Sequence, residues 1–332
     1  MDPLLKIVEE HVKKGSTLIV AVSGGPDSVY LLEQCRKLPP TLNLKLVVAH
    51  VNHSLRGKTS NEEAMFVKKL AQKYSLPFEQ KKISLGKKSA TSKNQEEEGR
   101  NERYKFLEQV RQKHKAAWIL TGHHLNDNIE TALFNLIRGA NLSGLKGMEI
   151  ASPKRFLLRP LLTIPKTEIV QYLKKNHLPY RLDQSNNNMN FSRNWLRKKV
   201  IPLFKKINPN FEETFQSNLQ NLTETYQFIE ELSQKWLAKN YLKNTFSLKK
   251  FLAEPPALQK NILVHIYKNI YGSTNKLTNK HLEQILQLLH QRKSNREKEF
   301  GQQYKIKLVK NADGPQTRIE KSSKISKMRT AD

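Results

Sequence analysis

The sequence predicts an α/β fold: a doubly wound parallel sheet followed by a smaller, mainly helical C-terminal domain. Apolar, β-branched runs alternate with segments of helical period from residue 3 to residue 138, the pattern of a parallel sheet with helices on both faces. Polar clusters follow three of the expected strands, at the carboxyl ends where such sheets bind ligands. The chain has 332 residues, 37% of them hydrophobic, which is enough for about two domains with real cores.

The first half of the chain alternates helix and strand in a regular order. Short β-branched runs between turn residues indicate strands, and apolar residues at helical spacing indicate the helices between them. The stretch 84–95, SLGKKSATSKNQ, is typical of a flexible loop. In order, we expect helix 3–14, strand 17–22, helix 27–37, strand 44–51, helix 60–75, strand 78–84, helix 96–114, strand 117–121 and helix 126–138.

The character of the chain changes after Lys154. A helix is expected over 165–177, followed by a polar stretch, DQSNNNMNFSRNWLRKKVIPLF, before Asn-Pro-Asn at 208–210. Residues 241–292 show amphipathic helical spacing, and two short strands are expected around the turn at 313–315. The predicted organisation is a domain over 1–208, a helical linker over 209–240, a basic domain over 241–320 and a disordered basic tail over 321–332.

The chain is strongly basic, with 58 Lys and Arg against 30 Asp and Glu and a net charge of +28. Such a surplus indicates a polyanionic partner, most often nucleic acid, and a solvated basic surface is the alternative. The single cysteine, Cys35, excludes an internal disulfide and Cys-rich zinc or iron–sulfur sites. No apolar run reaches the roughly 18 residues of a membrane span, and the N-terminus lacks the order of a signal peptide, so we expect a cytoplasmic protein without a membrane segment.

The stretch SGGPDS, residues 23–28, lies between an expected strand and an expected helix. Gly24 and Gly25 permit backbone angles that side chains forbid, so successive N–H groups can point at one anion above a helix N-terminus. The loop has neither the lysine of GxxxxGK[ST] nor the pattern GxGxxG. An acid in such a loop is explained by a metal between it and phosphates, so Asp27 is expected to bind Mg²⁺. The alternative is an ordinary Gly-Pro-Asp turn that caps a helix.

Two further polar clusters, HVNHSLR at 50–56 and TGHHLND at 121–127, also follow expected strands and should meet the loop at one site. Their histidines suggest zinc, but no HExxH helix or cysteine partner supports such a site. Histidines beside a nucleotide explain the clusters better. Asp127 and Glu130 are three residues apart, so both carboxylates face the same way at the first turn of a helix, where capping is the alternative.

Two basic segments are candidate contacts for RNA. The stripe E-x3-R-x2-RY over 96–104 lies on one side of a helix, where a solvated ion-pair face is equally possible. From Arg193 to Lys206 there are six basic residues and no acidic one, with Trp195 among them. Basic side chains beside an aromatic ring suit an RNA strand.

These motifs together resemble the tRNA(Ile)-lysidine synthetase family of the PP-loop ATP pyrophosphatase superfamily. SGGxDS alone identifies only the superfamily, whereas its combination with RG…GL and DxSN…RN is far more specific. The matching pieces follow the family's order over about two hundred residues. They are SGGPDS (23–28), HVNHSLR (50–56), the stripe at 96–104, TGHHLNDNIET (121–131), RGANLSGLKGM (138–148), RPLL (159–162) and DQSN…RNWLR (183–197).

The resemblance implies an adenine nucleotide alpha hydrolase-like fold that cleaves ATP between its α- and β-phosphates. It implies ligation of L-lysine to C2 of cytidine 34 in the CAU anticodon of tRNA(Ile) through an adenylated cytidine, with ATP and Mg²⁺ as cofactors. Residues 1–208 would form the catalytic domain, and 241–320 would help to hold tRNA. The family commonly has two adjacent aspartates where this chain has Asn126-Asp127, and Asp127 is taken as the working acid. The oligomeric state stays open, with a homodimer among the options.

The alternatives are another PP-loop tRNA-modifying enzyme and a catalytically silent tRNA-binding protein. Sulfur-transfer relatives use cysteine thiols, for which Cys35 alone is a poor substitute, and small-molecule amidotransferases would not need a charge of +28. The resemblance and the residue types assign the following sites. The catalytic residues are Asp27, Asp127, Glu130 and Arg193; the ATP-binding residues are Ser23, Gly24, Gly25, Pro26, Asp27, Ser28, His50 and Arg56; the substrate and tRNA contacts are Arg100, Arg103, His123, Arg138, Asn194, Arg197, Lys198 and Lys199; and Asp27 holds Mg²⁺.

Overall fold

A computed structural model of the chain describes residues 3–53, 58–83, 92–181, 192–242, 244–272, 277–291, 297–300, 304–311 and 314–321. The chain divides into two compact units, Met1–Phe134 with Gly147–Ser217 and Asn135–Lys146 with Asn218–Asp332. The first unit contains a mostly parallel sheet, and the second contains an antiparallel one. Within the described part of the chain, no helix is both long enough and apolar enough to cross a membrane.

The expected alternation of helices and strands is confirmed from the N-terminus onward, with ends that shift by a few residues. The largest difference is at 84–95, where the sequence predicts a loop: a helix begins at Ser92, and residues 84–91 lie outside the described part. The elements are α1 (Pro3–His11), β1 (Thr17–Ala21), α2 (Pro26–Arg36), β2 (Lys45–His53), α3 (Lys58–Lys73), β3 (Phe78–Ile83), α4 (Ser92–Lys113), β4 (Trp118–Leu120) and α5 (Leu125–Ile137).

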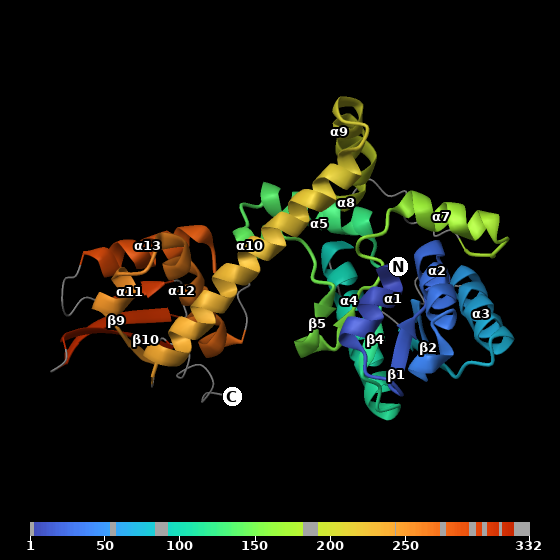
Figure 1. Cartoon of the computed structure of the whole chain (residues 1–332), viewed down its shortest axis with the longest axis horizontal. Helices are drawn as coiled ribbons and strands as arrows, with labels where there is room; N and C mark the ends of the chain where they lie inside the picture. The colour runs from blue at the N-terminus through green and yellow to red at the C-terminus, as the bar shows by residue number, and fades with distance from the viewer. Residues whose placement is uncertain are drawn as a thin grey trace. The chain divides into compact units, whose positions relative to one another are not determined.

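The sheet of the first unit has six strands in the order β3-β2-β1-β4-β6-β5 (Figure 1). Two very short strands, β5 (Ala151–Ser152) and β6 (Leu157–Leu158), extend it where the sequence indicated only a change of character, and β5 alone runs antiparallel to its neighbour. The order reverses between β1 and β4. In open parallel sheets, ligands bind outside the carboxyl ends of the strands at such a reversal, so this point locates the candidate site.

Helices cover both faces of this sheet because the central strand is apolar on both sides. Leu18 and Val20 of β1 pack with α1, α2, α3 and the later helix α7 (Lys166–Lys175), whereas Ile19 packs with α4 in a second core. The doubly wound parallel sheet predicted from the sequence is therefore confirmed.

The described part of the polar stretch after α7, which begins at Ser192, forms an interrupted helix: α8 (Ser192–Trp195), a π-helical turn (Leu196–Val200) and α9 (Ile201–Ile207). Pro202 explains the interruption, because it has no N–H to donate to the carbonyl four residues earlier. The next helix, α10 (Phe211–Asn240), is continuous for 30 residues. Its first turns and α9 pack against α5 through a small apolar cluster that includes Ile129 and Phe211.

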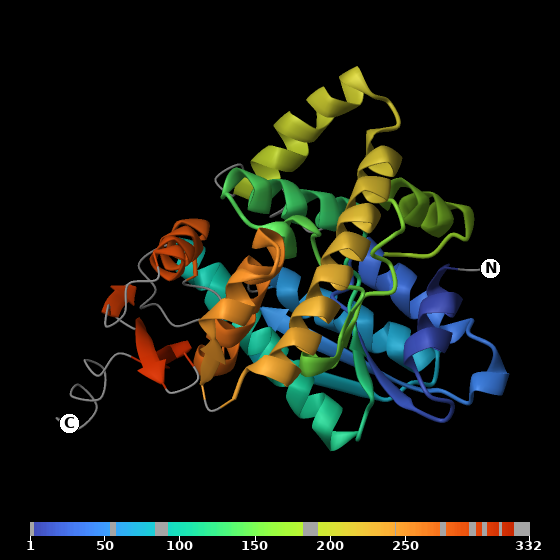
Figure 2. The ribbon, with the colours of Figure 1, turned by 60° about the vertical axis from the view of Figure 1, so that its left-hand side comes forward.

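The second unit combines helices with a four-stranded antiparallel sheet in the order β7-β10-β9-β8. Figures 1 and 2 show its helices beside this sheet, and Trp236, Phe246 and Phe251 lie in their shared core. Two strands were expected near residue 313; β9 and β10 confirm them, while β7 and β8 were not predicted. The elements are α6 (Leu142–Leu145), β7 (Thr245–Ser247), α11 (Leu248–Leu252), α12 (Pro256–Tyr271), α13 (Asn279–His290), β8 (Glu297–Phe300), β9 (Tyr304–Asn311) and β10 (Gly314–Lys321).

The domain limits expected at residues 208 and 240 stay a prediction. The compact units themselves divide inside α10, between Ser217 and Asn218, and residues Asn135–Lys146 group with the second unit. Of the expected basic tail over 321–332, only Lys321 lies within the described residues.

Candidate active site

The loop SGGPDS connects β1 to α2 at the carboxyl edge of the sheet. Gly24 has a φ of +95°, a left-handed conformation that favours glycine. Gly25, the N-cap of α2, has a φ of −73° and a ψ of 165°. These are extended angles, typical of an N-cap, that any residue adopts. The expectation that both glycines use angles forbidden to side chains is thus confirmed for Gly24 and wrong for Gly25.

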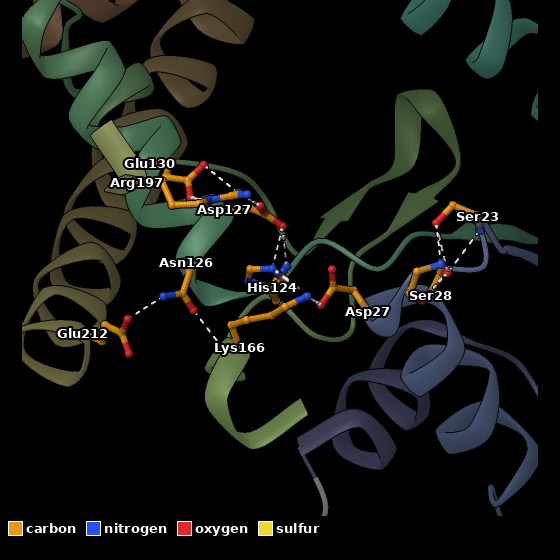
Figure 3. Close-up of polar contacts among 11 residues, drawn as sticks. Ser23, Asp27, Ser28, His124, Asn126, Asp127, Glu130, Lys166, Arg197 and Glu212 are labelled. Atoms are coloured by element: carbon orange, nitrogen blue, oxygen red, sulfur yellow. Dashed lines mark hydrogen bonds and ion pairs between the residues drawn. The ribbon is translucent and has the colours of Figure 1, made fainter. Parts of the chain in front are cut away.

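The loop's own hydroxyl groups hold its N–H groups (Figure 3). Ser28 Oγ accepts hydrogen bonds from the backbone N–H of Ser23 at 3.1 Å and of Gly24 at 3.2 Å, and it donates to Gly25 O at 2.9 Å. The N–H of Gly25 donates to Ser23 Oγ at 3.3 Å. The loop is therefore already shaped as a nest, and a bound anion would share or replace these serine contacts.

Gly122, just after β4, keeps the TGHHLND cluster close to the SGGPDS loop. A Cβ at this position would lie 3.1 Å from the backbone C and O of Asp27 and 3.2 Å from Ser28 N. Because those atoms are backbone at the start of α2, any side chain at residue 122 would push the loop and the TGHH segment apart.

Two carboxylates that are far apart in sequence, those of Asp27 and Asp127, lie on either side of the His124 ring (Figure 3). The Nε2 atom of His124 lies 3.7 Å from Asp27 Oδ1 and 3.4 Å from Asp127 Oδ2, and its backbone N–H donates to Asp127 Oδ2 at 3.2 Å. Burial lowers the pKa of His124, although both carboxylates oppose this shift. His124 is therefore neutral at pH 7 and can separate the two acids without adding charge.

Arg197 forms ion pairs with Glu130 and Asp127. Its guanidinium donates from Nε to Glu130 Oε1 at 2.6 Å and from Nη2 to Glu130 Oε2 at 3.0 Å, a bidentate pair, and Nη2 also reaches Asp127 Oδ1 at 3.3 Å. The carboxylate of Glu130 is almost wholly buried, whereas Asp127 is about a quarter exposed. Asp127 is thus the more accessible acid.

Lys166, the first residue of α7, forms an ion pair with Asp27 Oδ1. The prediction from sequence did not include this lysine. The two residues are 139 positions apart, and only the location of Lys166 shortly after RPLL, at an expected helix start, could have pointed to it. A loop that lacks its own lysine therefore has one beside it, supplied by a distant segment.

Asn126 shows how the chain accommodates its departure from two adjacent aspartates. Its Nδ2 donates to Glu212 Oε1 at 2.5 Å, and its Oδ1 accepts from the backbone N–H of Lys166 at 2.9 Å. An aspartate could not donate to Glu212, and two carboxylates there would repel each other. Asn126 thus ties the start of α5 to α7 and α10, while Asp127 faces His124.

Several other expected site residues lie at this edge. His50, buried within β2, donates a hydrogen bond from Nδ1 to Val22 O at 2.8 Å, and burial lowers its pKa. Burial also lowers the pKa of His123 to about 4; Asp127 opposes this shift, while Arg159, Arg100 and Arg103 add to it. Of the remaining expected residues, Asn194, Lys198 and Lys199 lie on α8 and the π-helical turn, Arg138 belongs to the second unit, only the backbone of Arg193 is described, and Arg56 lies outside the described residues.

The carboxylates suit a metal only together with a nucleotide. Among the described residues, no group of three or more His, Cys, Asp or Glu side chains is arranged to hold a metal ion. Asp27 offers one partly exposed carboxylate within the loop, which fits Mg²⁺ because that ion commonly takes one or two carboxylates and completes its shell with phosphate oxygens and water.

Comparison with known proteins identifies the family and supports the fold. Residues 2–204 match the family model of the PP-loop domain. The chain belongs to the PP-loop family. A solved structure of the U34-tRNA thiolase NcsA from Methanococcus maripaludis, with its [4Fe-4S] cluster, is similar with a TM-score of 0.54 and 18% identity over 67% of this chain and 78% of that one. At that identity the likeness shows the fold alone, and it agrees with the expected adenine nucleotide alpha hydrolase-like fold.

Curated proteins of the PP-loop family are similar over most of the chain. The tRNA(Ile)-lysidine synthases of Geobacillus kaustophilus and Bacillus subtilis are 32% and 34% identical over 87% and 82% of this chain. The bifunctional protein TilS/HprT of Listeria innocua is 33% identical over 86% of it. The matched regions cover 64%, 60% and 45% of those relatives, so the chain spans less than two thirds of their length.

Proposed function

We propose that the chain catalyses the ATP-dependent ligation of L-lysine to C2 of cytidine 34 in the CAU anticodon of tRNA(Ile), giving lysidine, AMP and pyrophosphate. The observation that carries the proposal is the group of Asp27, Asp127 and Glu130 beside a PP loop, in a chain whose curated relatives include tRNA(Ile)-lysidine synthases. Such a reaction takes place where tRNA and ATP are present, so a cytoplasmic location is part of the proposal.

The first step would activate the base. The loop's N–H groups and the N-terminus of α2 bind and orient the phosphates of ATP, and His50 lies next to the loop through Val22. Cytidine O2 attacks the α-phosphorus, the new O–P bond forms, and the bond to pyrophosphate breaks. A Mg²⁺ ion held by Asp27 would supply positive charge for the leaving pyrophosphate. The base must leave its stack to reach this edge of the sheet.

The second step would transfer lysine. The ε-amine arrives as an ammonium and becomes nucleophilic only after it loses a proton. We assign this role to Asp127, because it is exposed enough to receive a substrate, whereas both oxygens of Glu130 are bound by Arg197. The amine nitrogen forms a bond to C2, the C2–O bond breaks, and AMP leaves with that oxygen. Glu130 then acts by positioning Arg197.

The surface of α8, the π-helical turn and α9 suits RNA. Lys198, Lys199 and Lys206 are exposed there, and Trp195 presents 52% of its surface. Lysines attract phosphates, and an exposed indole offers a stacking face for an unpaired base.

The sulfur-transfer alternative has little support from the chain's chemistry. Cys35 is buried, and burial raises the pKa of its thiol to about 12. A thiol in this state is a poor nucleophile at neutral pH.

The test is to incubate the protein with ATP, lysine and a tRNA(Ile) transcript carrying CAU, and to measure AMP and lysine on the RNA. We expect one AMP for each lysine incorporated. A transcript with uridine in place of cytidine 34 is the matched control and should give neither product. Tight binding of both transcripts without AMP would instead favour a silent tRNA-binding protein.

A further inference from the structure

The ion pair between Lys166 and Asp27 lies at the accessible side of the PP loop. The lysine side chain is 32% exposed and that of Asp27 is 28% exposed, so solvent and ligands can reach both. Lys166 contacts Oδ1, the same oxygen that lies 3.7 Å from His124 Nε2. The ammonium therefore neutralises, through one of its two oxygens, the carboxylate that would hold Mg²⁺.

The backbone at Lys166 is fixed, whereas its side chain is free to change partner. The N–H of Lys166 donates to Asn126 Oδ1 at 2.9 Å, and Ile164 O accepts from Leu125 N at 3.0 Å. These bonds hold the start of α7 against the start of α5. A lysine has four flexible carbons between backbone and charge, so its ammonium can move by several ångströms while the helix stays in place.

We propose that Lys166 is the phosphate-binding lysine of this site. It neutralises Asp27 when no nucleotide is bound, and it transfers its ammonium to the phosphate oxygens of ATP when Mg²⁺ takes over the carboxylate. The inference rests on the proposed function. It follows from charge, because an ammonium and Mg²⁺ on the same carboxylate repel each other. The phosphates of ATP bound by the adjacent loop would then offer the ammonium another anionic partner.

This exchange explains why a loop without its own lysine can bind a triphosphate. In GxxxxGK[ST] loops the lysine comes from the loop itself. Here it would come from α7, and its pairing with Asp27 keeps it close to the loop before the nucleotide arrives. If the lysine instead only joins α7 to α2, the ion pair should persist in the presence of ATP.

The test compares Lys166→Met and Lys166→Arg with Lys174→Met, an exposed lysine of the same helix. Binding of ATP and of adenosine is measured by calorimetry with saturating Mg²⁺. We expect Lys166→Met to weaken ATP binding by about 10- to 100-fold, the loss of a charged hydrogen bond, and to leave adenosine binding unchanged. Lys166→Arg should retain most of the affinity, and Lys174→Met should behave as the unmodified protein.

A second measurement needs no variant. Acetylation of Lys166 in the unmodified protein is followed by mass spectrometry, with Mg²⁺ and either ATP or adenosine. Protection by ATP alone supports the proposal, and equal labelling overturns it. Unchanged or tighter ATP binding by Lys166→Met also overturns it. If the unmodified protein binds ATP but Lys166 behaves in either of these ways, only the proposal for Lys166 fails. If the unmodified protein binds no ATP at all, the proposed function fails too.

Discussion

Replacing Glu130 by Gln tests whether this acid positions Arg197 or handles the substrate. The amide keeps the size of the side chain but removes the charge that accepts two hydrogen bonds from the guanidinium, at 2.6 and 3.0 Å. Breaking a buried ion pair costs about 3–5 kcal/mol because the remaining charge stays desolvated. Since Arg197 is 41% exposed, water can solvate part of it, and we expect a loss of about 2 kcal/mol in the free energy of unfolding.

The matched change, Asp127→Asn, should reduce lysine transfer strongly and the stability of the fold only slightly. Its contact with Arg197 is longer, at 3.3 Å, and the carboxylate is 26% exposed, so we expect a loss of less than about 1 kcal/mol in stability. Lysine transfer should fall by about 100-fold or more, because the group that receives the ammonium and its proton is lost. Formation of adenylated tRNA should continue, since activation does not use that proton.

Two assays separate these effects. Denaturant unfolding of Glu130→Gln, Arg197→Met and the double variant gives the coupling energy of the pair, which we expect to be at least about 1 kcal/mol. Single-turnover reactions with α-labelled ATP follow label on the RNA with and without lysine. Glu231→Gln removes an exposed ion pair with Lys235 and is the control, which should change neither measurement.

Two results would refute the reasoning. If Asp127→Asn loses adenylation as completely as lysine transfer, Asp127 belongs to the metal and phosphate site. If it transfers lysine normally while Glu130→Gln does not, the roles of the two acids are reversed. A coupling energy near zero between Glu130 and Arg197 would show that their buried contact contributes nothing to the fold.

Three further predictions concern other parts of the chain. Asp27→Ala should abolish AMP formation while circular dichroism and the unfolding midpoint stay close to those of the unmodified protein, because the carboxylate that would hold Mg²⁺ is partly exposed; normal turnover with unchanged Mg²⁺ dependence would contradict its role. Gly122→Ala should weaken ATP binding about tenfold or more, measured by calorimetry, because its Cβ would meet the Asp27 backbone at 3.1 Å; unchanged affinity would show that the loop can shift freely. In the second unit, burial alone would raise the pKa of Glu230, but hydrogen bonds from His265, Tyr226 and Asn261 lower it to about 2. The stabilisation by Glu230 is therefore present above its ordinary pKa of 4.5 and lost as the pH falls towards 2. Glu230→Gln should lower the free energy of unfolding by about 1 kcal/mol at pH 6 and have little effect near pH 2. An equal effect at both pH values would show that the charge of Glu230 is not the source of the stabilisation.

The sequence alone determined the layered architecture of the first unit and the chemistry of its loop. The apolar run in β1 and the helical spacing around it are local patterns, and they indicate a parallel sheet without knowledge of any contact. The spacing of Asp127 and Glu130 likewise predicted two acids on one side of a helix, and both contact Arg197, although only Asp127 lies in the first turn of α5. The short strands β5 and β6 could not be predicted in this way, because two residues carry too little periodicity.

Only the tertiary structure decided which charges face one another. It paired Lys166 with Asp27 and Arg197 with Glu130, and it placed His124 between Asp27 and Asp127. It also showed that Asn126 is a donor to Glu212. No local pattern encodes these pairs, because each joins segments far apart in the chain, and their distances depend on how the strand ends and helix starts pack at the point where the strand order reverses.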